Sequence, residues 1–176
     1  MNERILVTYT SYTGSTAEIA EAIAETLAQT SAQVELLPMR DVESLSGFSA
    51  VVIGSPIRKS KWSPEAMKFI QNHQVELARK RVATFTVSIT MAMSNGKQYR
   101  QAVSQWIAPV RALVQPVSEG LFAGRLDFSK LPFNWDSVKL RTVVALGIFP
   151  KDDRRDWKAV RAWAEGIHPL LTQKVV

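Results

Sequence analysis

A hydroxyl-rich loop near the start of the chain is the first group of residues whose types and spacing could do chemistry. It spans residues 10–16, Thr-Ser-Tyr-Thr-Gly-Ser-Thr, between an apolar run at 5–7 and a helix-patterned run that begins at Ala17. A helix N-terminus offers unpaired backbone N–H groups and a partial positive charge, and hydroxyls add further donors. The loop therefore suits a phosphate group, bound mainly by neutral donors because no Lys or Arg lies in it. A hydroxyl-rich turn that merely caps a helix is the alternative.

The elements that must position this loop alternate along the chain. Apolar runs predict strands at residues 4–9, 34–37, 50–54, 81–87 and 117–122. Helical periodicity predicts helices at 16–29, from Ser63 to Lys80 with a break near Asn72, at 97–114 with a bend at Pro109, and at 156–171, with a short helical turn at 41–45. This alternation predicts one α/β domain over residues 1–176, with a five-stranded parallel sheet covered by helices on both faces. The expected strand order is 2-1-3-4-5, with a ligand at the carboxyl ends near strands one and three.

Composition limits the classes of function. The chain has 176 residues and no cysteine, which excludes disulfides, thiolate catalysis and cysteine-bound metals. The two histidines, His73 and His168, lie far apart, so no metal is expected. No apolar run is long enough to span a bilayer, and no signal peptide is visible, so we expect a cytoplasmic protein. Nucleic acid is not expected as a partner, because no nucleic-acid motif accompanies the net charge of +6.

A long insertion, at about residues 124–153, separates the fifth strand from the last helix. It mixes apolar residues with basic ones, and a lid, a partner surface or a membrane contact are the functions that this composition suggests. The alternative is that it packs on the edge of its own sheet. Positive charge is concentrated after residue 50. Residues 1–50 contain two basic and seven acidic residues, a net charge of −5. Since the whole chain has a net charge of +6, residues 51–176 carry +11. A basic face can bind an anionic lipid surface or an acidic partner.

The loop resembles the phosphate loop of the flavodoxin family, Ser/Thr-x-Thr-Gly-x-Thr, in residues Ser11-Tyr12-Thr13-Gly14-Ser15-Thr16. This resemblance implies a flavodoxin-like three-layer fold and the cofactor FMN, with those six residues around its phosphate. It also implies that the flavin ring lies between two later loops. The residues expected there are Ser55, Pro56, Ile57, Arg58 and Trp62 in the first loop, and Ser88, Ile89, Thr90, Met91 and Ala92 in the second. Trp62 is expected either to stack on the ring or to anchor its loop to the next helix.

A closer resemblance appears around residues 51–58, Val-Val-Ile-Gly-Ser-Pro-Ile-Arg, with Phe69, Val87-Ser88 and Asp156-Trp157. These residues resemble the menaquinone-dependent protoporphyrinogen IX dehydrogenase branch of the flavodoxin superfamily. The resemblance implies an FMN-dependent oxidoreductase of porphyrin and heme biosynthesis, which passes electrons from a porphyrinogen to a quinone. The two propionates of such a substrate could pair with Arg58, Lys59 or Arg125. No side-chain general base is evident.

The expected partners are thus a porphyrinogen, a quinone and, through the insertion, the inner face of the cell membrane; a homodimer is left open. Three other functions also stay open. One is a flavodoxin-type electron carrier, which the basic charge of residues 51–176 disfavours. The others are a flavin-dependent NAD(P)H:quinone reductase and a binding domain that has lost its flavin.

Overall fold

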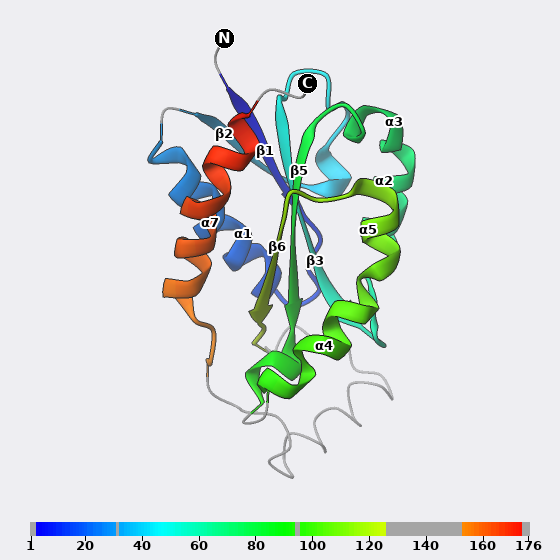
Figure 1. Cartoon of the computed structure of the whole chain (residues 1–176), viewed down its shortest axis with the longest axis vertical. Coiled ribbons are helices and arrows are strands. Elements are labelled where there is room, and N and C mark those ends of the chain that lie inside the picture. Colours follow the sequence, from blue (N-terminus) through cyan, green and yellow to red (C-terminus); the bar gives the residue numbers. More distant parts are fainter. Residues whose placement is uncertain (1–2, 31, 94–95, 126–152, 174–176) are drawn as a thin grey trace.

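A parallel sheet lies between two layers of helices (Figure 1) in the computed structural model, which describes residues 3–30, 32–93, 96–125 and 153–173. The parallel strands follow the order β2-β1-β3-β5-β6. They are β1 (Arg4–Tyr9), β2 (Gln33–Pro38), β3 (Ala50–Arg58), β5 (Arg81–Ser88) and β6 (Ser118–Ala123). A two-residue strand, β4 (Lys61–Trp62), turns back antiparallel on the end of β3. Because β5 and β6 are the fourth and fifth parallel strands, the predicted order 2-1-3-4-5 is confirmed.

The helices divide between the two faces of the sheet (Figure 1). One face is covered by α1 (Ser15–Ala28) and α7 (Trp157–Thr172). The other is covered by α2 (Pro64–Asn72), α3 (Gln74–Leu77) and α5 (Ala108–Val114), while α4 (Gly96–Trp106) precedes α5. Two short 3-10 helices, η1 (Met39–Asp41) and η2 (Ile89–Ala92), follow β2 and β5. The fold is thus the expected three-layer α/β arrangement.

The apolar runs form strands because both faces of the sheet are buried. In β1, Ile5 and Val7 point to the α1 and α7 side, while Leu6 points to the opposite side. In β3, Val52 and Val51 divide in the same way. Side chains alternate across a strand, so a strand covered on both faces needs apolar residues at every position.

The structure corrects several predicted boundaries. The helical turn expected at 41–45 is wrong, because the turn is η1 and it lies over Met39–Asp41. Strand β3 runs four residues beyond Gly54, to Arg58. The helix expected from Ser63 is divided into α2 and α3, close to the predicted break at Asn72, and the helix around Pro109 is divided into α4 and α5. The predictions for the insertion lie outside the described residues, apart from its ends.

Candidate functional site

Three loops meet at one edge of the sheet, after β1, β3 and β5. The carboxyl ends of parallel strands share an edge, so these loops must be neighbours. One contact joins the first two loops, since the Arg58 guanidinium carbon lies 5.2 Å from the Tyr12 ring centroid. The third loop is joined to the end of β6, where the Gly124 N–H donates to the Ser88 carbonyl at 3.0 Å. The loops that the sequence assigned to a flavin are therefore brought together.

The loop after β1 has the geometry of an anion site. Gly14 precedes α1 with a φ of 91°, and its N–H donates to the Ser11 Oγ at 3.1 Å. No side chain of the described residues caps the first turn of α1, so its N–H groups face the loop without a side-chain acceptor. Ser15 and Thr16 are buried, and the loop carries no carboxylate of its own. This donor set fits a phosphate.

Contacts with β3 and α2 hold this loop in place. The Thr10 N–H donates to the Gly54 carbonyl at 3.1 Å, and the Thr10 hydroxyl donates to Glu65 Oε2 at 2.8 Å. Gly54 is required by close packing, because a Cβ there would lie 2.0 Å from the Phe85 ring. The sequence placed Thr10 in the loop but gave no sign of Glu65, since their contact joins two elements that are distant in the chain.

A tight hairpin extends β3 beyond the sheet edge. Lys59 and Ser60 form its turn with φ values of 50° and 59°, and Arg58 pairs with Lys61 across it. Positive φ at both central residues is typical of a type I′ turn, which is strained for residues other than Gly, Asn and Asp. The hairpin presents Arg58, Lys59 and Lys61 as exposed side chains beside the Tyr12 loop. This rim is strongly basic.

Trp62 does not lie where a stacking residue would be needed. It is buried in the second strand of the hairpin, β4, and its indole N–H donates to the Thr86 hydroxyl at 2.9 Å. The expected stacking role is therefore corrected, because a buried indole cannot cover a ligand ring. Trp62 does anchor its loop, but to strand β5 through Thr86 and not to the next helix, which was the alternative. Ser55 is used internally as well, since its hydroxyl accepts from the Ser63 N–H at 3.0 Å and donates to the Pro56 carbonyl at 3.1 Å. Ser55 is fully buried inside β3, opposite Thr86 of β5, so its hydroxyl serves the hairpin and the start of α2.

The loop after β5 begins with the 3-10 helix η2. The Ser88 and Thr90 hydroxyls hydrogen-bond to each other across its start, at 2.5 Å. Ile89, Thr90 and Met91 are half-buried and Ala92 is buried. This loop therefore offers half-buried apolar side chains at the same edge of the sheet.

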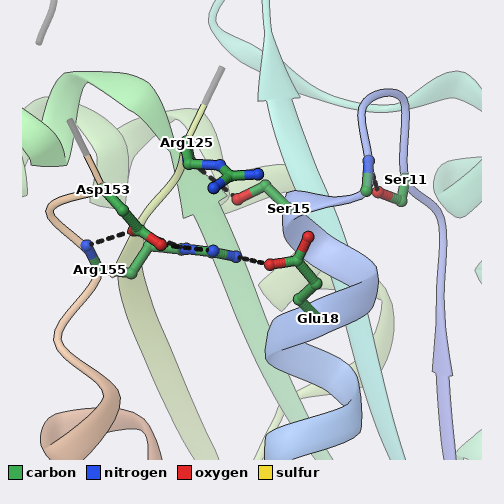
Figure 2. Close-up of polar contacts among 7 residues, drawn as sticks. Ser11, Ser15, Glu18, Arg125, Asp153 and Arg155 are labelled. Atoms are coloured by element: carbon green, nitrogen blue, oxygen red, sulfur yellow. Dashed lines mark hydrogen bonds and ion pairs between the residues drawn. The ribbon is translucent and has the colours of Figure 1, made fainter. Parts of the chain in front are cut away.

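A charged cluster lies beside the first turn of α1 (Figure 2). The buried Arg155 contacts two carboxylates: its Nη1 lies 2.7 Å from Glu18 Oε2, and its Nη2 lies 2.6 Å from Asp153 Oδ2. Arg125 enters the same region from the end of β6, where its backbone N–H donates to the Ser15 Oγ at 2.9 Å. The two ends of the insertion, at Arg125 and Asp153, therefore both lie next to the phosphate loop. The sequence missed Arg155, because nothing in its local pattern distinguishes it from neighbouring Arg154.

Hydrogen bonds set the ionisation of this cluster. The Arg155 guanidinium lowers the pKa of Asp153 to about 2, chiefly through its side-chain hydrogen bond, and Arg125 adds to the effect from farther away. Burial lowers the pKa of Arg155, but the hydrogen bonds to Asp153 and Glu18 outweigh it, so that this pKa is raised overall. Asp153 and Arg155 are therefore both charged near neutral pH.

Comparison with known proteins identifies the family. The family model described as "Flavodoxin domain" matches residues 6–148, which include most of β1, the phosphate loop, the hairpin and the strands from β2 to β6. The chain belongs to the flavodoxin domain family. Membership implies FMN as the cofactor, and the donor set of the loop at residues 11–16 fits its phosphate.

Individual relatives are distant. The chain is 25% identical over 175 residues to the protoporphyrinogen IX dehydrogenase [quinone] of Leishmania major, covering 95% of this chain and 75% of that protein. Among solved structures, it is similar to a flavodoxin from the domain Archaea, with a TM-score of 0.58 and 16% identity over 97% of this chain and 99% of that one. It is also similar to a single-site mutant of the flavodoxin from Pseudomonas aeruginosa, with a TM-score of 0.59 and 9% identity over 97% and 99% of the two chains. These structural likenesses show the fold alone.

Other kinds of centre find no support in the described residues. No group of three or more His, Asp or Glu residues gathers there in a metal-like cluster. Nor does any helix of the described segments have the length and apolar character needed to cross a membrane. The family and the site together describe a flavodoxin-type flavoprotein, an oxidoreductase or an electron carrier.

Proposed function

We propose that this flavoprotein is a protoporphyrinogen IX dehydrogenase that passes electrons to a membrane quinone. The observation that carries the proposal is the basic hairpin at the carboxyl edge of the sheet, beside the phosphate loop. This hairpin bears Arg58, Lys59 and Lys61. A 25% identical relative with this printed activity supports the choice of substrate. A flavodoxin-type carrier is the main alternative, and the positive charge of residues 51–176 disfavours it, because carriers of that kind are typically acidic.

The chain's own residues would bind and orient the substrate. Protoporphyrinogen carries two propionates, and arginine pairs with carboxylates through two parallel hydrogen bonds. Arg58 is exposed, and its contact with the Tyr12 ring orients its side chain toward the loop after β1. We propose Arg58 and Lys59 as propionate contacts. The two-residue turn holds Arg58 opposite Lys61, and the hydrogen bond from the buried Trp62 to Thr86 ties this hairpin to β5.

FMN would supply the electron-transfer chemistry when bound. The chain's contribution would be to place the substrate beside the loops after β3 and β5, and to limit access of water through the half-buried side chains of Ile89 and Met91. Positive charge at the rim would also favour binding of a dianionic substrate over a neutral one.

The substrate role of Arg58 is tested by charge reversal. We expect Arg58→Glu to lower kcat/KM for protoporphyrinogen by about tenfold or more, since a charge-assisted pair is replaced by repulsion, while the Kd for FMN changes by less than about threefold. Arg79→Glu is the matched control, because Arg79 is exposed just before the amino end of β5, at the opposite edge of the sheet. Equal effects on turnover and FMN binding would remove Arg58 from the substrate role. A wild-type protein that binds FMN but does not oxidise protoporphyrinogen with any quinone would overturn the proposed function and favour the carrier.

We further propose that the protein works at the inner face of the cell membrane and contacts it through the insertion at 124–153. The sequence of this insertion mixes apolar and basic residues, which suits an anionic lipid surface. Co-sedimentation with vesicles that contain anionic lipid should occur for the full chain. It should be lost on deletion of residues 126–149 with FMN binding retained, and pelleting that survives the deletion would refute the contact.

A further inference from the structure

The phosphate loop contains no positive side chain, yet a phosphate monoester carries a charge of about −1.5 to −2 at neutral pH. Neutral donors alone would have to compensate this charge. A cation is available at the end of β6, which is distant from α1 in the sequence but lies beside it in space (Figure 2).

Arg125 is fixed directly against the first residue of α1. Its backbone N–H donates to the Ser15 Oγ at 2.9 Å, and the preceding residue, Gly124, donates to the Ser88 carbonyl at 3.0 Å. Two consecutive backbone hydrogen bonds thus determine where the Arg125 side chain starts. In Figure 2 its guanidinium lies above the Ser15 hydroxyl, and in that view it points away from Asp153.

The carboxylates of the neighbouring cluster are engaged by another arginine. Glu18 and Asp153 lie 2.7 Å and 2.6 Å from the two terminal nitrogens of Arg155. Arg155 therefore compensates one of their two negative charges and holds both carboxylates close to its guanidinium. An acidic pair next to a phosphate would repel it, and Arg155 weakens this repulsion near Ser15. The negative charge that remains is a further reason why a phosphate there needs a cation of its own.

We propose that Arg125 pairs with the phosphate group of FMN and makes this site selective for the phosphorylated flavin. The guanidinium adds charge-assisted hydrogen bonds to the backbone and hydroxyl donors of residues 11–16. The phosphate site is then shared by β1, through its loop, and β6, through Arg125. This role is distinct from the propionate contact that the sequence suggested for Arg125.

The test compares FMN with riboflavin, which lacks the phosphate, by quenching of flavin fluorescence at equilibrium. For Arg125→Ala we expect the Kd for FMN to rise about tenfold, the loss typical of one charge-assisted hydrogen bond, while the Kd for riboflavin changes by less than about twofold. Arg125→Lys should retain part of the selectivity, and Arg79→Ala, which removes a positive charge at the opposite edge, should change neither Kd.

Two results would overturn the proposal: an unchanged Kd for FMN in Arg125→Ala, or an equal loss of both flavins. The backbone donor to Ser15 survives in every variant, so folding should be preserved, and a urea midpoint checks this. If Arg125→Ala does not fold, Arg125→Gln is measured instead, and FMN binding as tight as in the wild type would then be decisive against the pairing. Because no porphyrinogen is used, the outcome is independent of the proposed enzyme activity.

Discussion

Replacement of Arg155 by methionine should destabilise the protein markedly, although this residue lies outside the phosphate-loop motif. The Arg155 side chain is only 3% exposed and contacts the carboxylates of Glu18 and Asp153. Its guanidinium carbon also lies 4.4 Å from the Trp157 ring centroid. One side chain therefore connects α1, the residue at the end of the insertion and the start of α7. Methionine keeps an apolar stem but removes all three interactions.

The size of the effect follows from these contacts. The pKa of Asp153 falls from 3.8 to about 2, which at 1.36 kcal/mol per unit corresponds to about 2.4 kcal/mol before screening. The Asp153 side chain is 32% exposed, so we discount this to about 1 kcal/mol. Loss of the half-exposed Glu18 pair and of the cation–π contact adds about 0.5–1 kcal/mol each. We expect Arg155→Met to lower the free energy of unfolding by about 2–3 kcal/mol.

The loss should depend on pH in a defined direction. The folded-state pKa of Asp153 is depressed, so its stabilising contribution is complete above its unfolded value of 3.8 and is lost as the pH falls toward about 2. The difference in stability between wild type and Arg155→Met should therefore narrow across this window. Above pH 5, the contribution of Asp153 to this difference should be constant.

Urea unfolding, followed by circular dichroism at pH 7 and at pH 3, measures both effects. Arg161→Met is the matched control, because Arg161 is exposed on α7. Adding Glu18→Gln to Arg155→Met should restore part of the loss, since it removes a carboxylate left without its partner. A loss of unfolding free energy below about 0.5 kcal/mol at pH 7, the level of an ordinary surface substitution, would show that Arg155 does not stabilise the fold in this way.

Three further predictions concern the loops. Thr13→Ala combined with Thr16→Ala should raise the Kd for FMN about tenfold or more by removing phosphate donors, and an unchanged Kd in calorimetry would move the phosphate elsewhere. Trp62→Phe should lower the free energy of unfolding by about 1–2 kcal/mol, because the buried Thr86 hydroxyl loses its donor, but should leave the flavin absorption spectrum unaltered; an altered spectrum would restore a ring contact. Ser60→Gly should raise stability by about 0.5–1 kcal/mol by relieving a φ of 59°, and a lower thermal midpoint would contradict the strain.

The layers and the strand order could be predicted because a strand that is buried on both faces has a recognisable sequence pattern. Continuous apolar runs such as Val51-Val52-Ile53 occur where a strand is covered on two sides. The last residues of β3 lack this pattern, because they include Pro56, a residue that is typical of loops. β1 stops pairing with β3 at Gly54, so beyond it β3 has one parallel neighbour, β5, and a residue without an N–H is tolerated there.

The contacts of the site were less predictable because they join elements that are distant in the chain. The hairpin turn at Lys59 and Ser60 lacks the Asn-Gly or Asp-Gly signal that marks type I′ turns. The burial of Trp62 depends on Thr86 in another strand, and the position of Arg125 depends on Ser15. Local residue types predicted which loops lie together at the carboxyl edge of the sheet, but they could not predict the side-chain contacts between those loops.

The shared packing of α1 and α7 has a consequence for how the protein is made. α1 leaves the ribosome well before α7, which covers the same face of the sheet through Val160, Ala164 and Ile167. Until α7 is synthesised, the apolar side chains that it covers stay open to water. A nascent chain arrested after β6 should therefore be held open and bind chaperones, and it should become protease-resistant only when α7 has emerged.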